Sequence, residues 1–256
     1  MHDTALFYGK KFFETYAIKG SKILDVGSKD KNGSLRKYTE GKHEYIGIDM
    51  ISGNNVDIVQ KNPYVLPFED DTFDIVTSSS VFEHSQMFWV LSNEIFRILK
   101  KDGLFYMNAP SNGPYHTYPV DCYRFYPDAG NGIMEWGSLN GFKDLTILES
   151  FIGDKKNDNW NDFICIFLKD KKYLNNYPNR IIDSDKNFTF GRKNLDANLY
   201  NAKIKNNAAL MSDQKISGIL KLLYIKFKFL FLKIIKKILF IRKINKIIKN
   251  LGWLNA

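Results

Sequence analysis

The chain has 256 residues, of which 44% are hydrophobic and 15% aromatic, enough for a packed α/β domain and too apolar for an intrinsically disordered chain. Its formal net charge of +9 is unevenly distributed, because residues 215–256 hold eleven Lys and Arg and no Asp or Glu. With those eleven taken from the total of 37, residues 1–214 carry 26 basic and 28 acidic side chains, a net charge of −2. This near-neutral part argues against nucleic-acid binding, which calls for a basic face.

The number of cysteines and the N-terminal residues indicate the cellular compartment of the protein. Only two cysteines are present, Cys122 and Cys165, and residues 1–4 lack the charged leader and apolar core of a secretory signal. We therefore expect a reduced, cytoplasmic setting. The spacings of His, Cys and carboxylate residues match no zinc signature, so the sequence predicts no metal ion.

Apolar periodicity predicts helices that alternate with strands over the first 170 residues. Helical spacing is found at 4–16 and 87–100. Strand-like runs occupy 22–27, 45–49, 55–59, 73–79, 103–110, 143–150 and 162–169. The last two runs are joined by a short polar link, which predicts a hairpin and an antiparallel strand near the sheet edge. The pattern predicts an α/β domain with a Rossmann-like, doubly wound, mostly parallel seven-stranded sheet and helices on both faces.

The remaining sequence divides into two parts. Residues 171–214 are polar and Asn-rich, and we expect a linker or loosely packed extension there. Residues 215–256 combine their basic side chains with regularly spaced Leu, Ile and Phe. Their uncharged runs are far shorter than the ~20 residues that a membrane-spanning helix needs.

The spacing within residues 215–256 predicts a basic amphipathic helix. Its apolar face would hold Leu220, Leu223, Phe227, Leu230, Phe231, Ile234, Ile238 and Ile241. Lysines fall opposite or beside that face, as in helices that lie in an anionic membrane surface. Packing on its own domain or on a second copy is the alternative, and RNA binding is a weaker one.

A glycine turn follows the first predicted strand, in the stretch LDVGSKDKNGSL (24–35), and a helix is expected after it. Gly27 can bring the backbone close to a ligand at this strand end, or can simply make a tight turn. Asp49 ends the next strand, where its carboxylate can accept both ribose hydroxyls of an adenosine. A dinucleotide site needs G-x-G-x-x-G, but Lys29 and Asn32 replace two of these glycines. S-adenosylmethionine (SAM) has no phosphate and tolerates this loss, and Asp25 suits its cationic amino group.

Three further stretches carry a family resemblance: LPFEDDTFDIVTSSSVFEHS (66–85), EIFRILKKDGLFYMNAP (94–110) and PSNGPYHTYPVDCYRFYPD (110–128). With the glycine turn they resemble a class I SAM-dependent methyltransferase of the methyltransferase type 11-like group. They are most similar to the branch found in bacterial surface-polysaccharide and capsule biosynthesis clusters. The resemblance covers residues 20–170, and it implies the same doubly wound fold.

The resemblance also implies cofactor-binding residues. Asp25 and Gly27 would flank the methionyl end of SAM, Asp49 would hold the ribose, and Met50 would lie against the adenine. The usual G-x-G of the family is G-S-K here.

Three more cofactor-binding residues follow from the resemblance. Asn62 would meet the adenine amino group, where the family usually has Asp, and its amide oxygen can still accept that hydrogen bond. Ser79 and Ser80 would line the cofactor near the methyl donor. Capping of the following helix is the alternative role for these serines.

The stretch 110–128 leaves the fifth predicted strand above the expected methyl group, so we expect it to form the acceptor pocket. His116 is the candidate general base, because the pKa of histidine lies near operating pH, and His84 could reach the same space. Asp121 could orient the His116 imidazole or bind a sugar hydroxyl, and Arg124 suits an anionic group on the acceptor. Flat walls would come from Tyr115, Tyr118, Tyr123 and Tyr126.

Structural roles are the alternatives at these positions. The stretch could be a proline-stapled surface loop in which Asp121 and Arg124 pair with each other. His84 could be satisfied by a backbone carbonyl, in a helix-face pair with Glu83.

We therefore expect transfer of the SAM methyl group to a hydroxyl, or to an amine or phosphate-linked group, of a surface-glycan or capsule precursor. The basic tail agrees with a peripheral position on the inner face of the cytoplasmic membrane, and no nucleic-acid partner is expected. The alternative is a non-catalytic SAM-binding or membrane-tethered scaffold. The acceptor and the oligomeric state stay open.

Overall fold

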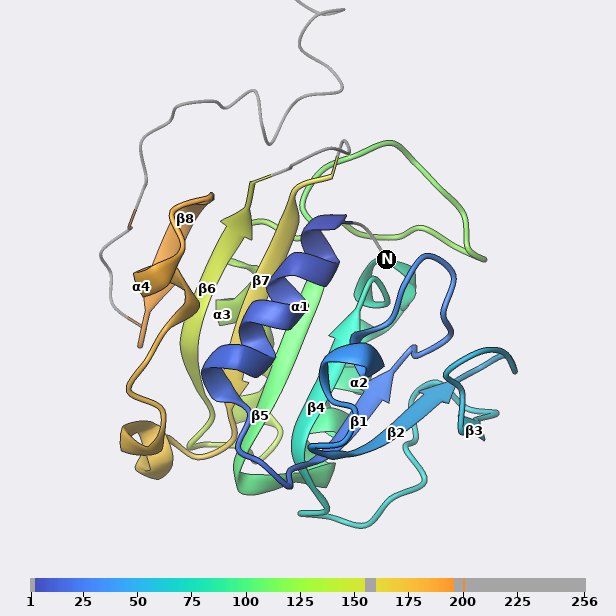
Figure 1. Cartoon of the computed structure of the whole chain (residues 1–256), viewed down its shortest axis with the longest axis horizontal. Helices are drawn as coiled ribbons and strands as arrows, with labels where there is room; N and C mark the ends of the chain where they lie inside the picture. Colours follow the sequence, from blue (N-terminus) through green and yellow to red (C-terminus); the bar gives the residue numbers. More distant parts are fainter. Residues whose placement is uncertain (1–2, 155–159, 196–199, 201–256) are drawn as a thin grey trace, which may run out of the picture. The chain divides into compact units, whose positions relative to one another are not determined.

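The structure, a computed structural model, describes residues 3–154, 160–195 and 200. An eight-stranded sheet runs through this part of the chain, in the order β3-β2-β1-β4-β5-β7-β6-β8 (Figure 1). Its strands are β1 (Lys22–Val26), β2 (Glu44–Asp49), β3 (Ile58–Val59), β4 (Phe73–Ser79), β5 (Leu99–Pro110), β6 (Thr146–Gly153), β7 (Asp162–Leu168) and β8 (Phe188–Lys193).

The strand directions confirm a mostly parallel sheet. Each neighbour from β3 to β5 pairs in parallel with the next. β7 is antiparallel to both β5 and β6 and lies third from one edge of the sheet, which agrees with the predicted late antiparallel strand. The prediction of seven strands is wrong, because an eighth strand, β8, pairs antiparallel with β6 and forms that edge.

The eighth strand changes the expected role of residues 171–193. Instead of a loose linker, this segment forms β8 preceded by η3 (Lys171–Asn176) and α4 (Ile181–Ser184). Three apolar side chains, spaced among polar ones, are buried in a core cluster of the main domain: Ile181, Ile182 and Phe188. Their burial ties a polar segment to the sheet.

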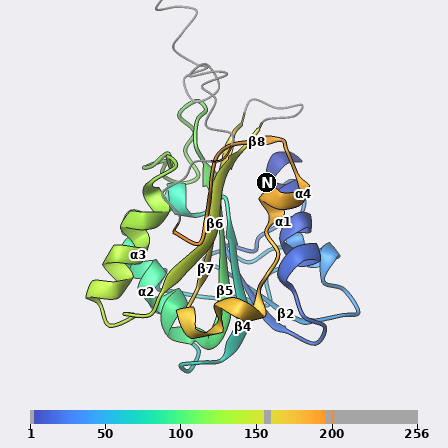
Figure 2. The same ribbon diagram turned by 90° about the vertical axis from the view of Figure 1, so that its left-hand side faces the viewer.

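Helices cover both faces of the sheet, as the sequence predicts. α1 (Asp3–Tyr16) and α4 lie on one face, and α2 (Phe88–Ile98) and α3 (Ala129–Leu139) lie on the other (Figure 2). Each face has its own buried cluster: Phe12 packs on Tyr106 under α1, and Phe96 packs on Phe105 under α2. Because β5 supplies both Phe105 and Tyr106, adjacent residues of one strand feed the two cores.

A buried carboxylate, Glu149 on β6, joins the elements of the α1 face. Its Oε1 accepts hydrogen bonds from the Tyr16 hydroxyl (2.6 Å) and the Ile181 N–H (2.8 Å), and its Oε2 accepts one from the Ile182 N–H (3.1 Å). Burial raises the pKa of Glu149, and these hydrogen bonds act in the opposite direction. The carboxylate therefore links the end of α1 to the start of α4.

Two local predictions need correction. The helix expected after the glycine turn is only the four-residue 3₁₀ helix η1 (Leu35–Tyr38). Turn-forming residues occupy the space before it, and Asp30 Oδ1 accepts a hydrogen bond from the Gly33 N–H (2.7 Å). The third strand, expected at 55–59, is limited to Ile58 and Val59.

The predicted basic amphipathic helix, residues 215–256, lies outside the described residues. Across the ranges that the structure describes, no helix has both the length and the apolar character needed to cross a membrane.

Candidate cofactor and acceptor site

The carboxyl ends of β1, β2, β4 and β5 meet at one edge of the sheet, where the sequence predicts the cofactor. Gly27 follows β1 with φ +79°, a conformation that favours glycine. Its N–H donates to the Ile48 carbonyl (2.8 Å), which ties the turn to β2. The Val81 side chain fills the space that a Cβ on Gly27 would need. The glycine therefore allows the loops after β1 and β4 to pack together.

Asp49 ends β2 beside this turn. Its Oδ2 accepts a hydrogen bond from the Lys29 N–H (3.1 Å), and its Oδ1 accepts one from the Ile51 N–H (3.0 Å). Met50 and Ile51 next to it are exposed. The structure thus brings a carboxylate and an apolar surface together at the end of β2, beside the glycine turn.

Asp25 lies deeper than expected. Its carboxylate is buried in the sheet and accepts hydrogen bonds from the Thr77 hydroxyl (2.7 Å) and the Tyr45 hydroxyl. Burial is the main cause that raises the pKa of Asp25 to about 6, and the two hydroxyl donors lower it. Asp25 is therefore held by β2 and β4 and acts first as a support for the turn.

The remaining predicted cofactor residues differ in exposure. Asn62 is exposed, and its Oδ1 accepts a hydrogen bond from the Tyr64 N–H (2.9 Å). Ser79 is buried, and its hydroxyl donates to Asn108 Oδ1 on β5 (2.9 Å). Ser80 adopts φ +57°, and its hydroxyl has no hydrogen-bond partner among the described residues.

This edge of the sheet fits SAM. Each Asp49 oxygen accepts one backbone hydrogen bond and keeps a lone pair that a ribose hydroxyl can use. The exposed Met50 offers an apolar surface for the adenine. Ser28, beside Gly27, is buried, and within the described ranges its hydroxyl has no partner, which is the condition of a polar atom that a ligand satisfies.

The loop 111–128, which we name the acceptor loop, packs against the segment after β4 and reaches the glycine turn. The Cys122 N–H donates to the Glu83 carbonyl (2.7 Å). At its far side, the Lys31 ammonium lies 5.0 Å from the centre of the Tyr118 ring. The loop therefore spans from the cofactor edge to the η2 turn (Phe82–His84).

The two candidate bases lie together between η2 and the acceptor loop. The rings of His84 and His116 meet edge to face, with their centres 5.0 Å apart. His84 Nδ1 contacts the Val120 carbonyl, which agrees with the structural role considered for this residue. His116 Nδ1 lies 3.3 Å from Asp121 Oδ2, so Asp121 is placed to orient that imidazole.

Asp121 and Arg124 pair with each other, which is the structural alternative for these two residues. Arg124 donates to both Asp121 oxygens (2.5 and 2.8 Å) and to the Pro114 carbonyl (2.7 Å). Burial opposes ionisation of Asp121, but the hydrogen bonds from Arg124 and from the His116 N–H lower its pKa to about 2. The pair fixes the shape of the acceptor loop.

Glu83 is a residue of this site to which the sequence assigns no chemistry. Its side chain is 1% exposed, and neither carboxylate oxygen has a hydrogen-bond partner among the described residues. Burial is the main cause that raises the pKa of Glu83 to about 8, and burial also lowers the pKa of the neighbouring His84. The sequence marks Glu83 only by its place beside a histidine.

An aromatic cavity of about 460 Å³ adjoins the acceptor loop. Two of the predicted substrate residues, Tyr123 and Arg124, line it together with Phe88, Trp89, Phe125 and Trp136. Tyr115 and Tyr118 are not in its lining and are 76% and 51% exposed. The aromatic wall thus comes from α2 and α3 as well as from the loop, which sequence spacing alone does not indicate.

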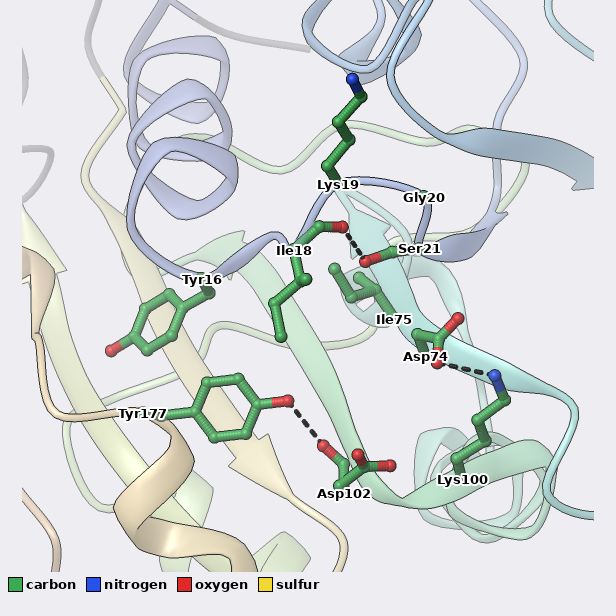
Figure 3. Close-up of a pocket in the computed structure, with 10 residues that line it drawn as sticks. All are labelled: Tyr16, Ile18, Lys19, Gly20, Ser21, Asp74, Ile75, Lys100, Asp102 and Tyr177. Atoms are coloured by element: carbon green, nitrogen blue, oxygen red, sulfur yellow. Dashed lines mark hydrogen bonds and ion pairs between the residues drawn. The ribbon is translucent and has the colours of Figure 1, made fainter.

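A second cavity, of about 310 Å³, lies at the opposite edge of the sheet (Figure 3). It is bordered by the end of α1 and the starts of β1 and β4, where Lys100 Nζ donates to Asp74 Oδ1 (2.7 Å). The Tyr177 hydroxyl donates to the Asp102 carbonyl (2.7 Å). The amino ends of parallel strands are not where open α/β sheets bind cofactors.

Residues 24–107, from β1 into β5, match the model of a methyltransferase domain family. Similar curated proteins include an uncharacterised methyltransferase of Mycobacterium leprae, 30% identical over 115 residues, or 40% of this chain and 42% of that protein. A demethylmenaquinone methyltransferase of Staphylococcus saprophyticus is 31% identical over 123 residues, or 42% of this chain and 52% of that protein. The chain spans about half or less of the length of these relatives.

Among solved structures, the chain resembles the 1,6-didemethyltoxoflavin-N1-methyltransferase of Burkholderia thailandensis, which was solved with 1,6-didemethyltoxoflavin and S-adenosylhomocysteine. The TM-score is 0.52 at 13% sequence identity, over 65% of this chain and 78% of that chain, and it shows a shared fold. The family match over residues 24–107 and the shared fold indicate a SAM-dependent methyltransferase domain in this part of the chain, with SAM as its cofactor.

Proposed function

We propose that this protein transfers the methyl group of SAM to a hydroxyl group on a sugar of a surface-glycan or capsule precursor. The carrying observation is the position of the acceptor loop. It contacts the glycine turn through Tyr118 and Lys31, and it lines the aromatic cavity through Tyr123 and Arg124. An acceptor bound there has the cofactor edge on one side and the cavity on the other.

The polar and aromatic character of this region suits a sugar. Flat aromatic side chains such as Trp89 and Trp136 pack on the apolar faces of sugar rings, and the Tyr123 hydroxyl and Arg124 supply polar contacts. Arg124 is held by Asp121, so a phosphate or carboxylate on the acceptor would meet a guanidinium that is already positioned. This lining also suits an amine or a phosphate-linked group as the acceptor.

Methyl transfer forms a bond between the acceptor oxygen and the methyl carbon while the bond from carbon to sulfur breaks. The bonding pair stays on sulfur, which gives S-adenosylhomocysteine, and the hydroxyl proton must leave. His116 is our candidate for direct removal of that proton, with His84 as the neighbour that could replace it. Most of the rate would come from holding the acceptor in line.

The sequence of residues 215–256 supports a place at the membrane surface. Eleven basic side chains with no acidic one suit attraction to anionic lipid headgroups. We propose a peripheral position on this basis.

The test uses the full chain, SAM labelled in its methyl group, and a panel of nucleotide-linked and lipid-linked sugars. We expect label in at least one sugar, stable to mild alkali, because an ether resists conditions that cleave methyl esters. Label on a nitrogen or on a phosphate oxygen, located by fragmentation in a mass spectrometer, would replace the hydroxyl as the acceptor atom. SAM binding with no transfer to any member of the panel would overturn the glycan proposal and favour a non-catalytic role.

A further inference from the structure

Glu83, His84 and His116 form a cluster of metal-ligating side chains at the acceptor side of the cofactor edge. One ligand atom from each of the three lies within 4.8 Å of the other two. Two of the residues come from η2, directly after β4, and the third comes from the acceptor loop. From these positions we propose that the three side chains bind a single divalent transition-metal ion, with Zn²⁺ as the best match.

The first argument is the state of Glu83. The side chain is 1% exposed, and across the described residues neither of its carboxylate oxygens has a hydrogen-bond partner. A buried carboxylate without donors is costly, and it is retained where a cation or a partner charge compensates it. Within the cluster, the nearest ring nitrogen is His84 Nε2, at 3.6 Å from Glu83 Oε1, and a neutral imidazole provides no positive charge. A bound cation would compensate the Glu83 carboxylate and accept the lone pair of His84 Nε2.

The second argument is the orientation of His84. Its Nδ1 faces the Val120 carbonyl, and only a protonated ring nitrogen can donate to that oxygen. In the neutral ring, Nε2 then carries the lone pair, and this is the nitrogen that lies beside Glu83. Histidines that ligate metals are commonly held in this way, with the second nitrogen bound to a backbone carbonyl.

His116 shows the same arrangement with a carboxylate. The Arg124 Nη2 donor lies 3.4 Å from His116 Nδ1, but two acceptors also face this nitrogen: Asp121 Oδ2 at 3.3 Å and the Pro114 carbonyl at 3.4 Å. The two acceptors favour a proton on Nδ1. The lone pair is then on Nε2. Asp121 is held in turn by two hydrogen bonds from Arg124, which fixes the ring. A carboxylate that orients a ligating imidazole is a recurrent feature of metal sites.

The ligand types select the class of metal. Two imidazoles and one carboxylate suit Zn²⁺ and related first-row ions, whereas Mg²⁺ and Ca²⁺ prefer oxygen ligands. Zinc sites with three protein ligands leave the fourth position for water or substrate. Zinc bonds of roughly 2.0–2.2 Å put tetrahedral donor atoms roughly 3.3–3.6 Å apart, so donors that lie up to 4.8 Å apart must move closer when the ion binds.

The open position gives the ion a role in the reaction, and this part of the inference rests on the proposed function. An acceptor hydroxyl bound at the open position would become more acidic, and its proton would pass to water. The oxygen would then form the bond to the methyl carbon as the sulfur–carbon bond breaks. His116 would be a ligand in this scheme, and it could not also act as the general base.

The experiment measures metal binding by the full chain without SAM or acceptor. Protein freed of metal by a chelator is titrated with Zn²⁺ against a chromophoric competitor, and with Co²⁺ while visible absorption is recorded. We expect one equivalent per chain and the intense visible bands of a four-coordinate Co²⁺ site. His84→Ala and His116→Ala should each weaken Zn²⁺ binding by more than about 100-fold, and Asp121→Asn by about 10–100-fold.

Two variants keep the test independent of folding. Glu83→Gln removes the carboxylate that would ligate the ion and keeps the side-chain shape, so the metal-free protein should keep its melting temperature while binding is lost. His43→Ala, at a half-buried histidine outside the cluster, should bind Zn²⁺ like the unchanged protein. Zn²⁺ binding that none of the three cluster variants reduces, or no binding at all, would overturn the metal site.

The outcomes for metal and for activity separate cleanly. Metal binding without methyl transfer to any sugar would overturn the proposed glycan acceptor, and the metal-site proposal would stand. Methyl transfer that persists after chelation, in a protein that binds no Zn²⁺, would overturn the metal site. His116 would then again be the candidate general base.

Discussion

Val81 and Gly27, on two different loops of the cofactor edge, are in direct contact, and Val81 fills the space where a Cβ on Gly27 would be. Because Gly27 also has φ +79°, Gly27→Ala would add both backbone strain and a steric clash. We expect a loss of about 2–4 kcal/mol in the free energy of unfolding, measured in denaturant. Adding Val81→Ala should recover part of that loss by removing the clash.

Gly20 provides the matched control for this prediction. Its φ is +88°, but no atom lies within 4 Å of the Cβ position, so Gly20→Ala adds strain without a clash. It should cost about 1–2 kcal/mol. Equal losses for the two alanine variants would show that the contact with Val81 is unimportant.

Asp49→Ala should weaken SAM binding, because its carboxylate is our predicted acceptor for the ribose hydroxyls. The expected loss is roughly 1.5–3 kcal/mol, the range for a hydrogen bond to a charged group. Calorimetry with SAM and with NAD measures it, and Asp74→Asn, at the opposite edge, serves as the control (Figure 3). Tight NAD binding in the absence of SAM binding would contradict the cofactor assignment.

Asp25 should make stability depend on pH. Its pKa is raised from 3.8 to about 6 by burial, so the folded chain holds the proton more tightly than the unfolded chain. Stability is therefore lost as pH rises from about 4 through 6, by roughly 3 kcal/mol in total. The free energy of unfolding of Asp25→Asn should rise relative to that of the unchanged protein as pH increases from about 4 through 6. Denaturant unfolding at several pH values measures this difference. A constant difference between the two proteins from pH 4 to 7 would rule this out.

Tyr16→Phe should loosen the attachment of α1. The Tyr16 hydroxyl donates to the buried Glu149 carboxylate at 2.6 Å, and its removal should cost about 1.5–3 kcal/mol. Tyr177→Phe is the control, since the Tyr177 hydroxyl donates to the exposed Asp102 at its backbone carbonyl. That change should cost about 1 kcal/mol or less. A larger cost for Tyr177 than for Tyr16 would mean that Glu149 is not a major attachment point.

Removal of residues 215–256 should leave SAM affinity unchanged and abolish binding to vesicles that contain anionic lipid. Added salt should weaken vesicle binding by the full chain, because charges are screened beyond about 8–10 Å at physiological ionic strength. Neutral vesicles are the control in a sedimentation assay. Unfolding of the shortened chain, or a full chain that ignores anionic vesicles, would instead favour packing on the domain or on a second copy.

Most strands and helices of the first 110 residues were predictable because their apolar spacing is regular, whereas the helix after the glycine turn and the third strand are shorter than predicted. β4 has the bounds that its sequence indicates, and α2 begins and ends within two residues of its prediction. β8 was not predictable, since half of it is Gly191, Arg192 and Lys193 and it gains its place from pairing with β6. Strand formation at a sheet edge depends on the neighbouring strand as much as on the segment itself.

The candidate site also contains residues that the sequence reveals and residues that it does not. Asp49 and Gly27 could be found from their distance along the chain, because parallel strands bring their ends to one edge. The cluster of Glu83, His84 and His116 could not, because His116 comes from a separate segment and no local spacing links it to the other two residues. Burial of Glu83 is a property of the packed loop, and it appears only once the acceptor loop is in place.

The edge position of β8 has a consequence for any shortened form of this protein. β6 has eight residues, all of them buried, and β8 supplies its outer hydrogen bonds. A chain ended after β7 would leave that ladder open and expose a flat, apolar strand to other molecules. Such edges recruit further copies strand by strand, so the fragment would be prone to aggregate even with every cofactor-binding residue present. By pairing with β6, the segment 171–193 therefore protects this strand from pairing with other copies of the chain.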